Sequence, residues 1–139
     1  MSGTLYGIGL GPGDPELLTL KAVRILSNVP AIAFPVPDSG HSMARAIAAP
    51  YLRPGLAEIG FGLCMRIDSA PGQAAYDDAA DAIAARLQGG EDVALLCEGD
   101  PFFYGSFLYL FERLAGRFRV DIVPGISSPM AAAAAMRTP

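Results

Sequence analysis

The sequence has few of the residue types that build metal and disulfide sites. Its 139 residues include one histidine, two cysteines and no tryptophan. Cys64 and Cys97 lie far apart, each inside an apolar run, so we expect two reduced, buried thiols rather than a disulfide framework or a zinc site. The single histidine, His41, lies in a loop before an expected helix, where a surface or capping role suits it better than catalysis. No metal site is therefore expected.

Charged residues are also few, and acidic residues outnumber basic ones. Ten Lys and Arg against 14 Asp and Glu give a formal net charge of -4. This balance lacks the positive surface that nucleic acids and anionic membranes attract, although a small basic patch is still compatible with it. The first residues, MSGTLYGIG, show no signal-peptide pattern, and the late apolar run 130–136 is too short to span a bilayer. We therefore expect a cytoplasmic protein that binds neither nucleic acid nor membrane.

What the chain does have is apolar content and a repeating order of segments. Hydrophobic residues make up 52% of it, enough for the closed core of one domain. Short apolar runs alternate about five times with segments of helical period, which predicts an α/β fold: a mainly parallel sheet of about five strands with helices on both faces. The expected strands are 5–9, 31–36, 56–63, 92–97 and 119–123. The expected helices are one that starts after the N-cap Asp14 and runs through Leu26, then 42–49, 73–88, 105–115 and 127–136.

Three loops follow expected strands, at the edge where parallel α/β sheets bind their ligands. The first, 9–15, is rich in glycine and precedes a helix N-terminus, so backbone N–H groups can approach a ligand closely. It matches neither the dinucleotide-binding nor the phosphate-loop pattern, and a tight turn explains it as well.

The second loop, 98–106, combines two acids with glycine and aromatics. Such a set suits a ligand with an apolar ring and hydroxyl or amino groups, but an N-capped helix start explains it equally. The third loop, 123–128, has serines that either cap the last helix or contact a ligand. Composition and spacing thus predict a small-molecule cleft and nothing finer.

Three strings, YGIGLGPGDPELLTLKAVRIL, EGDPFFYGS and VPGISS, resemble the signature blocks of the tetrapyrrole methylase family in order and spacing. The likeness covers the whole chain, and LCEGDPFFYGSFLYLFERL is most similar to members that methylate precorrin-2 at C20. The resemblance implies S-adenosylmethionine-dependent C-methylation of a tetrapyrrole in cobalamin biosynthesis, with precorrin-2 or cobalt-factor II as the substrate.

The resemblance also implies a cofactor cleft between two α/β domains. Residues 1–139 would be the N-terminal domain, with the family's C-terminal domain absent from this chain, and members are typically homodimers. Glu98 would contribute its backbone, since relatives often have glycine there. The residues implied to hold S-adenosylmethionine are Pro12, Glu98, Gly99, Asp100, Phe103, Ser127 and Ser128.

No catalytic base is assigned, because aligning the methyl group with its acceptor can supply most of the catalysis. Arg45, Arg53 and Arg66 are the local cations that could receive substrate carboxylates. The aspartates at 68, 77, 78 and 81 are better explained as solvated charge near a helix start than as metal ligands. Two other functions stay open: a methylase of the same superfamily acting on RNA or protein, which the acidic charge and the EGDPFFYGSFLYL block disfavour, and a non-catalytic ligand-binding domain.

Overall fold

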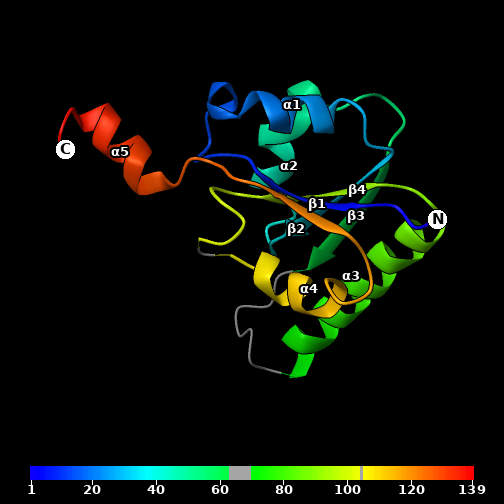
Figure 1. Cartoon of the computed structure of the whole chain (residues 1–139). Coiled ribbons are helices and arrows are strands. Elements are labelled where there is room, and N and C mark those ends of the chain that lie inside the picture. Colours follow the sequence, from blue (N-terminus) through cyan, green and yellow to red (C-terminus); the bar gives the residue numbers. More distant parts are fainter. Residues whose placement is uncertain (63–69, 104) are drawn as a thin grey trace.

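The computed structural model describes residues 1–62, 70–103 and 105–139 (Figure 1). Five strands form one sheet in the order β3-β2-β4-β1-β5, and every neighbouring pair is parallel. The strands are β1 (Leu5–Gly9), β2 (Ala31–Val36), β3 (Ala57–Gly62), β4 (Val93–Cys97) and β5 (Val120–Val123). The helices are α1 (Leu20–Leu26), α2 (Met43–Ala48), α3 (Ala70–Gln88), α4 (Phe107–Leu114) and α5 (Ser128–Met136). The α/β fold with a parallel sheet is therefore confirmed.

Helices cover both faces of the sheet. Successive side chains of a strand point to opposite faces, so a buried strand contributes to both hydrophobic clusters. In β4, Val93 and Leu95 pack in the cluster that includes α3 and α4. Ala94 and Leu96 pack on the opposite face, in the cluster that includes α1 and α2 (Figure 1). The uninterrupted run VALLC thus reflects a strand buried on two sides.

Helix α4 is held against α3 by one arginine. Arg113 donates through Nε to Asp77 Oδ1 (2.8 Å) and through Nη2 to Gln73 Oε1 (2.6 Å). The rings of Tyr76 and Tyr109 stack between the two helices with their centroids 5.1 Å apart. These contacts hold α4 against α3 from its first turn, at Tyr109, to its last, at Arg113. Asp77 is engaged in this ion pair, while residue 68 lies outside the described residues.

The helix expected from Asp14 through Leu26 is interrupted, which corrects the prediction. Asp14 caps only a short 3-10 turn, Pro15–Leu17, by accepting from Glu16 N–H (2.9 Å). Leu18 is extended, and Thr19 then caps α1 by accepting from Ala22 N–H (3.1 Å). Threonine competes for backbone donors at a helix start, so a second cap inside the apolar period begins a new helix.

Helix α5 extends away from the sheet at the edge where β5 ends (Figure 1). It is rich in alanine, and none of its residues, all within the described ranges, is buried. Met130 and Met136 are both more than half exposed. Across residues 1–62, 70–103 and 105–139, no helix is long and apolar enough to cross a membrane.

Candidate functional site

The three loops singled out in the sequence meet at the carboxyl edge of the sheet, because β4, β1 and β5 are neighbours. The first two loops pair through their backbones. Gly99 N–H donates to Gly11 O (2.8 Å), and Gly11 N–H donates to Gly99 O (3.2 Å). Leu10 N–H also donates to Cys97 O (2.8 Å), which continues the pairing of β1 with β4 beyond the strands.

The third loop reaches this pair through glycine. A Cβ placed on Gly125 would collide with Gly99 O and lie 2.8 Å from Gly9 C. A Cβ on Gly9 would in turn lie 2.5 Å from Gly125 N. No side chain fits at either position, so the three turns touch backbone to backbone. Sequence reasoning noted glycines in all three loops, but did not assign this contact to Gly9, Gly11 and Gly125.

Asp100 ties the second loop to the third. Its Oδ1 accepts from Gly125 N–H (2.9 Å) and its Oδ2 accepts from Phe102 N–H (3.0 Å). Its carbonyl oxygen accepts from Phe103 N–H (3.2 Å). A carboxylate has about four lone-pair positions, so two are left after these bonds. The side chain therefore orders the loops, and its two carboxylate oxygens can still accept one or two further hydrogen bonds.

Gly99 stands at the centre of the edge, in a backbone conformation that favours glycine. Its φ is +68°, and among the described residues only Ser127 Cα comes within 4.0 Å of a Cβ built there. The space in front of Gly99 is thus bounded by the start of α5. Ser127 is buried and caps that helix through its carbonyl, which accepts from Met130 N–H (3.1 Å). Its hydroxyl makes no capping bond within the described part of the chain.

The remaining expected site residues lie at the rim of the same edge. Pro12 and Glu98 are exposed, Ser128 is exposed in the first turn of α5, and Phe103 is 46% exposed. All seven residues named from the sequence therefore lie on the three joined loops.

Cys97 ends β4 directly beneath these loops. It is half-buried, and its Sγ lies 3.5 Å from Leu95 O. Burial raises the pKa of its thiol far above the ordinary value, and the nearby Asp100 carboxylate raises it further. A thiol in this state is a poor nucleophile, so the cysteine packs and does not react. Cys64 lies outside the described residues.

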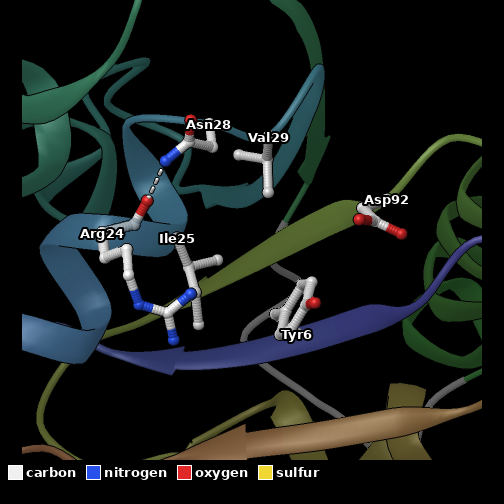
Figure 2. A pocket seen from close by; sticks show the side chains of 6 residues that line it. All are labelled: Tyr6, Arg24, Ile25, Asn28, Val29 and Asp92. Atoms are coloured by element: carbon white, nitrogen blue, oxygen red, sulfur yellow. Dashed lines mark hydrogen bonds between the residues drawn. The ribbon is translucent and has the colours of Figure 1, made fainter.

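A small hollow of about 150 Å³ lies at the opposite, amino-terminal end of the strands (Figure 2). Asp92 and Asn28 line it, and each has one polar atom bound to the backbone: Asp92 Oδ1 accepts from Thr4 N–H (2.7 Å), and Asn28 Nδ2 donates to Arg24 O (2.7 Å). The three joined loops, and the starts of α4 and α5 with no side-chain cap bond in the described part of the chain, lie at the other end of the sheet. We therefore place the candidate site at the carboxyl edge.

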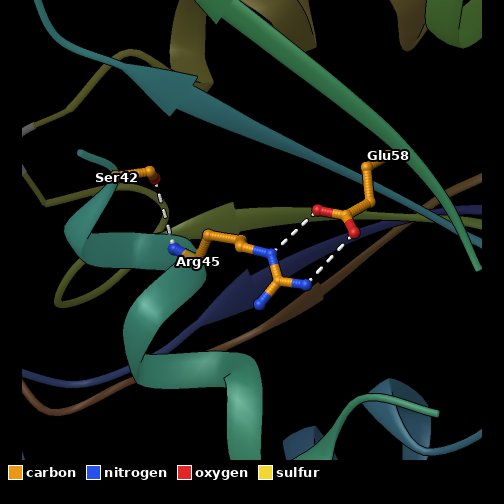
Figure 3. A network of polar contacts seen from close by, with 3 residues as sticks. All are labelled: Ser42, Arg45 and Glu58. Carbon is orange, nitrogen blue, oxygen red and sulfur yellow. Dashed lines mark hydrogen bonds and ion pairs between the residues drawn. The ribbon is translucent and has the colours of Figure 1, made fainter. Parts of the chain in front are cut away.

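Arg45, one of the cations considered for substrate carboxylates, is already paired (Figure 3). It binds Glu58 with two bonds, Nε to Oε1 (2.8 Å) and Nη2 to Oε2 (3.1 Å), while Ser42 caps its helix by accepting from Arg45 N–H. This pair joins α2 to the edge strand β3. Arg53 is exposed, and residue 66 lies outside the described residues.

We expect the Arg45–Glu58 pair to stabilise the fold only slightly, because both side chains are more than a third exposed. Arg45 lowers the pKa of the Glu58 carboxyl, so the stabilisation is present above the ordinary carboxyl pKa and is lost as the pH falls through the lower, folded value. Glu58→Gln should reduce the free energy of unfolding by less than about 1 kcal/mol near neutral pH. Urea unfolding at pH 7 and pH 3 checks this, and a larger difference at pH 3 than at pH 7 would contradict it.

Comparison with known proteins adds to this geometry. The chain is 48% identical over 145 residues to the cobalamin biosynthesis protein CobIJ of Mycobacterium tuberculosis, covering 99% of this chain and 28% of that protein. It is 41% identical over 134 residues to precorrin-2 C(20)-methyltransferase of a Sinorhizobium species, covering 91% of this chain and 55% of that enzyme. The chain thus spans only part of the length of these relatives.

A solved structure shares the fold. Uroporphyrin-III C-methyl transferase from Thermus thermophilus, in complex with S-adenyl homocysteine, superposes with a TM-score of 0.65 at 27% identity, covering 94% of this chain and 48% of that one. The family model of the tetrapyrrole (corrin/porphyrin) methylases matches residues 4–139. With the family's fold present and its model matched over nearly the whole length, this chain belongs to the tetrapyrrole methylases.

Proposed function

We propose that this chain is the N-terminal, cofactor-binding domain of an S-adenosylmethionine-dependent methyltransferase that methylates a tetrapyrrole of cobalamin biosynthesis, with precorrin-2 as substrate and C20 as the methylated carbon. One observation carries the proposal: three glycine-bearing loops are joined backbone to backbone at the carboxyl edge of a parallel sheet. The similarity to a precorrin-2 C(20)-methyltransferase supports the substrate. The homologous structure with S-adenyl homocysteine supports the cofactor.

The residues at this edge fit S-adenosylmethionine by shape and by chemistry. Around Gly13 and Gly105, no described heavy atom lies within 4 Å of a built Cβ, and Gly99 is nearly as open. A ligand can therefore approach the backbone closely there. Asp100 and Ser127 offer a carboxylate and a hydroxyl for ammonium and ribose groups, and exposed Phe103 offers a ring for adenine.

When bound, S-adenosylmethionine supplies an electrophilic methyl group with its leaving group already attached. The chain's own residues then have to hold the cofactor and orient its methyl group. Gly99 and Gly11 keep the loop backbones fixed, while Asp100 locks Gly125 and Phe102 in place. Good alignment of reacting atoms can contribute roughly 7–11 kcal/mol to a displacement, so preorganised loops are sufficient machinery for this half of the site.

The reaction is tested by presenting the longer protein that contains this chain with S-adenosylmethionine and one of three acceptors: precorrin-2, cobalt-factor II or ribosomal RNA. We expect methyl incorporation into a tetrapyrrole and none into RNA. Mass spectrometry of the product gives the number of methyl groups, and NMR gives the carbon. Methylation of RNA alone would refute the tetrapyrrole proposal, and a methyl group at another carbon would correct the position.

The role of the central glycine is tested by Gly99→Asn. Asparagine tolerates a positive φ better than other residues with a side chain, whereas valine is strained there, so Gly99→Val would confuse folding with binding. The new side chain would fill the space before Ser127, and we expect S-adenosylmethionine affinity to fall at least about tenfold, or about 1.4 kcal/mol. Calorimetric titration measures it, beside a thermal melt. A folded variant with unchanged affinity would remove this loop from the site.

A further inference from the structure

Phe102 is an exposed aromatic residue held in a fixed position. Its side chain is 54% exposed, yet its ring is braced by two others: the centroids of Phe107 and Phe111 lie 5.6 and 5.4 Å away, both in edge-to-face contact. Phe107 is buried, and the two rings of α4 are 5.8 Å apart. Phe103 and Leu108 nearby are also about half exposed, so Phe102 belongs to a local group of exposed apolar side chains, the kind of surface that marks an interaction site.

The place of Phe102 connects it to the candidate cofactor site. Its N–H donates to Asp100 Oδ2, and the other oxygen of the same carboxylate accepts from Gly125 N–H. The backbone of Phe102 is therefore tied through Asp100 to the loop of Gly125, while its ring lies against Phe107 and Phe111 of α4. Below it, Arg113 fixes α4 against α3, so the scaffold under the ring cannot easily shift.

The chemistry of this rim favours an apolar ring as its occupant. Arg113, the arginine on α4, is committed to Asp77 and Gln73, and Glu98 at the start of the loop is exposed and acidic. Carboxylate groups of a ligand would be disfavoured here, while a flat apolar surface would pack well on phenylalanine. A tetrapyrrole carries its carboxylates at the periphery and its apolar pyrrole rings and bridges inside them.

We infer that Phe102 is the platform on which the macrocycle of the substrate packs, with Phe107 and Phe111 as its support. This rests on the proposed function and deepens it, because it assigns to a single residue the contact with the ring of the substrate. Phe103, the next residue in the sequence, keeps its proposed contact with the adenine of the cofactor. Phe102 touches the substrate ring and orients it toward the methyl donor.

The test uses the longer protein of the proposed function with Phe102 replaced by Ala or by Tyr, and Leu20→Ala as a control that removes an exposed leucine at the start of α1. Cobalt-factor II is the probe, and its absorption band is followed during titration. We expect Phe102→Ala to weaken probe binding about tenfold to a hundredfold. Phe102→Tyr, which keeps the ring, and Leu20→Ala should bind as the unchanged longer protein does.

Two further measurements test whether the Phe102 ring contacts adenine or a second copy of the chain instead of the tetrapyrrole. S-adenosylmethionine affinity by calorimetry should be unchanged in Phe102→Ala, and a loss there would make the ring an adenine contact and overturn the inference. Sedimentation should show the same mass for all variants, and a change for Phe102→Ala would make the ring an interface between copies. Unchanged probe binding in Phe102→Ala refutes the platform alone. No band shift with the unchanged longer protein counts against the tetrapyrrole proposal itself.

Discussion

Gly125→Ala is expected to abolish measurable S-adenosylmethionine binding and to lower the melting temperature by about 5–10 °C. The added methyl would collide with Gly99 O and press on Gly9, all of it backbone that cannot turn away. Overpacking of this kind costs about 1–3 kcal/mol, and each kcal/mol is worth about 3–4 °C in a chain of this size. The collision also pushes apart the loops that Asp100 joins, so we expect affinity to fall at least about a hundredfold, or about 2.8 kcal/mol.

Gly116→Ala is the matched control for this variant. Gly116 lies in the turn after α4, its φ is not positive, and no described atom lies within 4 Å of a built Cβ. The same chemical change there should leave both the melting temperature and the affinity almost as they were. If Gly125→Ala bound S-adenosylmethionine normally, the close contact of the three loops would have no part in the site.

Residues 1–139 by themselves should bind S-adenosylmethionine weakly and turn over at least about a thousandfold more slowly than the full-length Sinorhizobium relative. The edge bearing the site is open: Phe102 and Phe103 are about half exposed, and α5 buries none of its residues within the described part of the chain. A substrate held on one side only loses most of the alignment that can supply roughly 7–11 kcal/mol.

Single-turnover assays with precorrin-2 on both proteins measure this difference directly. Adding the purified remainder of the Sinorhizobium relative, the part that this chain does not match, should restore part of the rate if the open edge is the cause. A rate for residues 1–139 close to that of the relative would show that one domain is sufficient, and that the site lies elsewhere than on the exposed edge.

Much of the fold could be predicted because its signals are local. The uninterrupted apolar run from Val93 to Leu96 and the helical stripe Tyr76, Ala80, Ile83 and Leu87 are local patterns, and all of these side chains are buried. The break at Leu18 could not be found from period alone, since the apolar pattern runs through it. The cap at Thr19 is a local signal that was missed, because threonine also occurs inside helices.

The three loops of the site could be predicted from the sequence, but the contacts between them could not. Glycines after strands identified the three loops, and the strand order that brings them together follows from the fold. The contact of Gly125 with Gly9 and Gly99 depends on how far the third loop turns back toward the first two. The spacing of residues in the sequence does not predict this. The same holds for the ion pair of Arg45 and Glu58, which are 13 residues apart in sequence.

The most direct measurement is the shift of backbone amide signals in the ¹⁵N NMR spectrum of this 139-residue chain as S-adenosylmethionine is added. The account predicts that the amides of Gly11, Gly99 and Gly125 shift together with one affinity. Those of Asn28 and Val29, beside the hollow at the other end of the sheet, should stay in place. Shifts confined to the amides around the hollow, with the three glycines unmoved, would contradict the assignment of the cofactor site to the carboxyl edge.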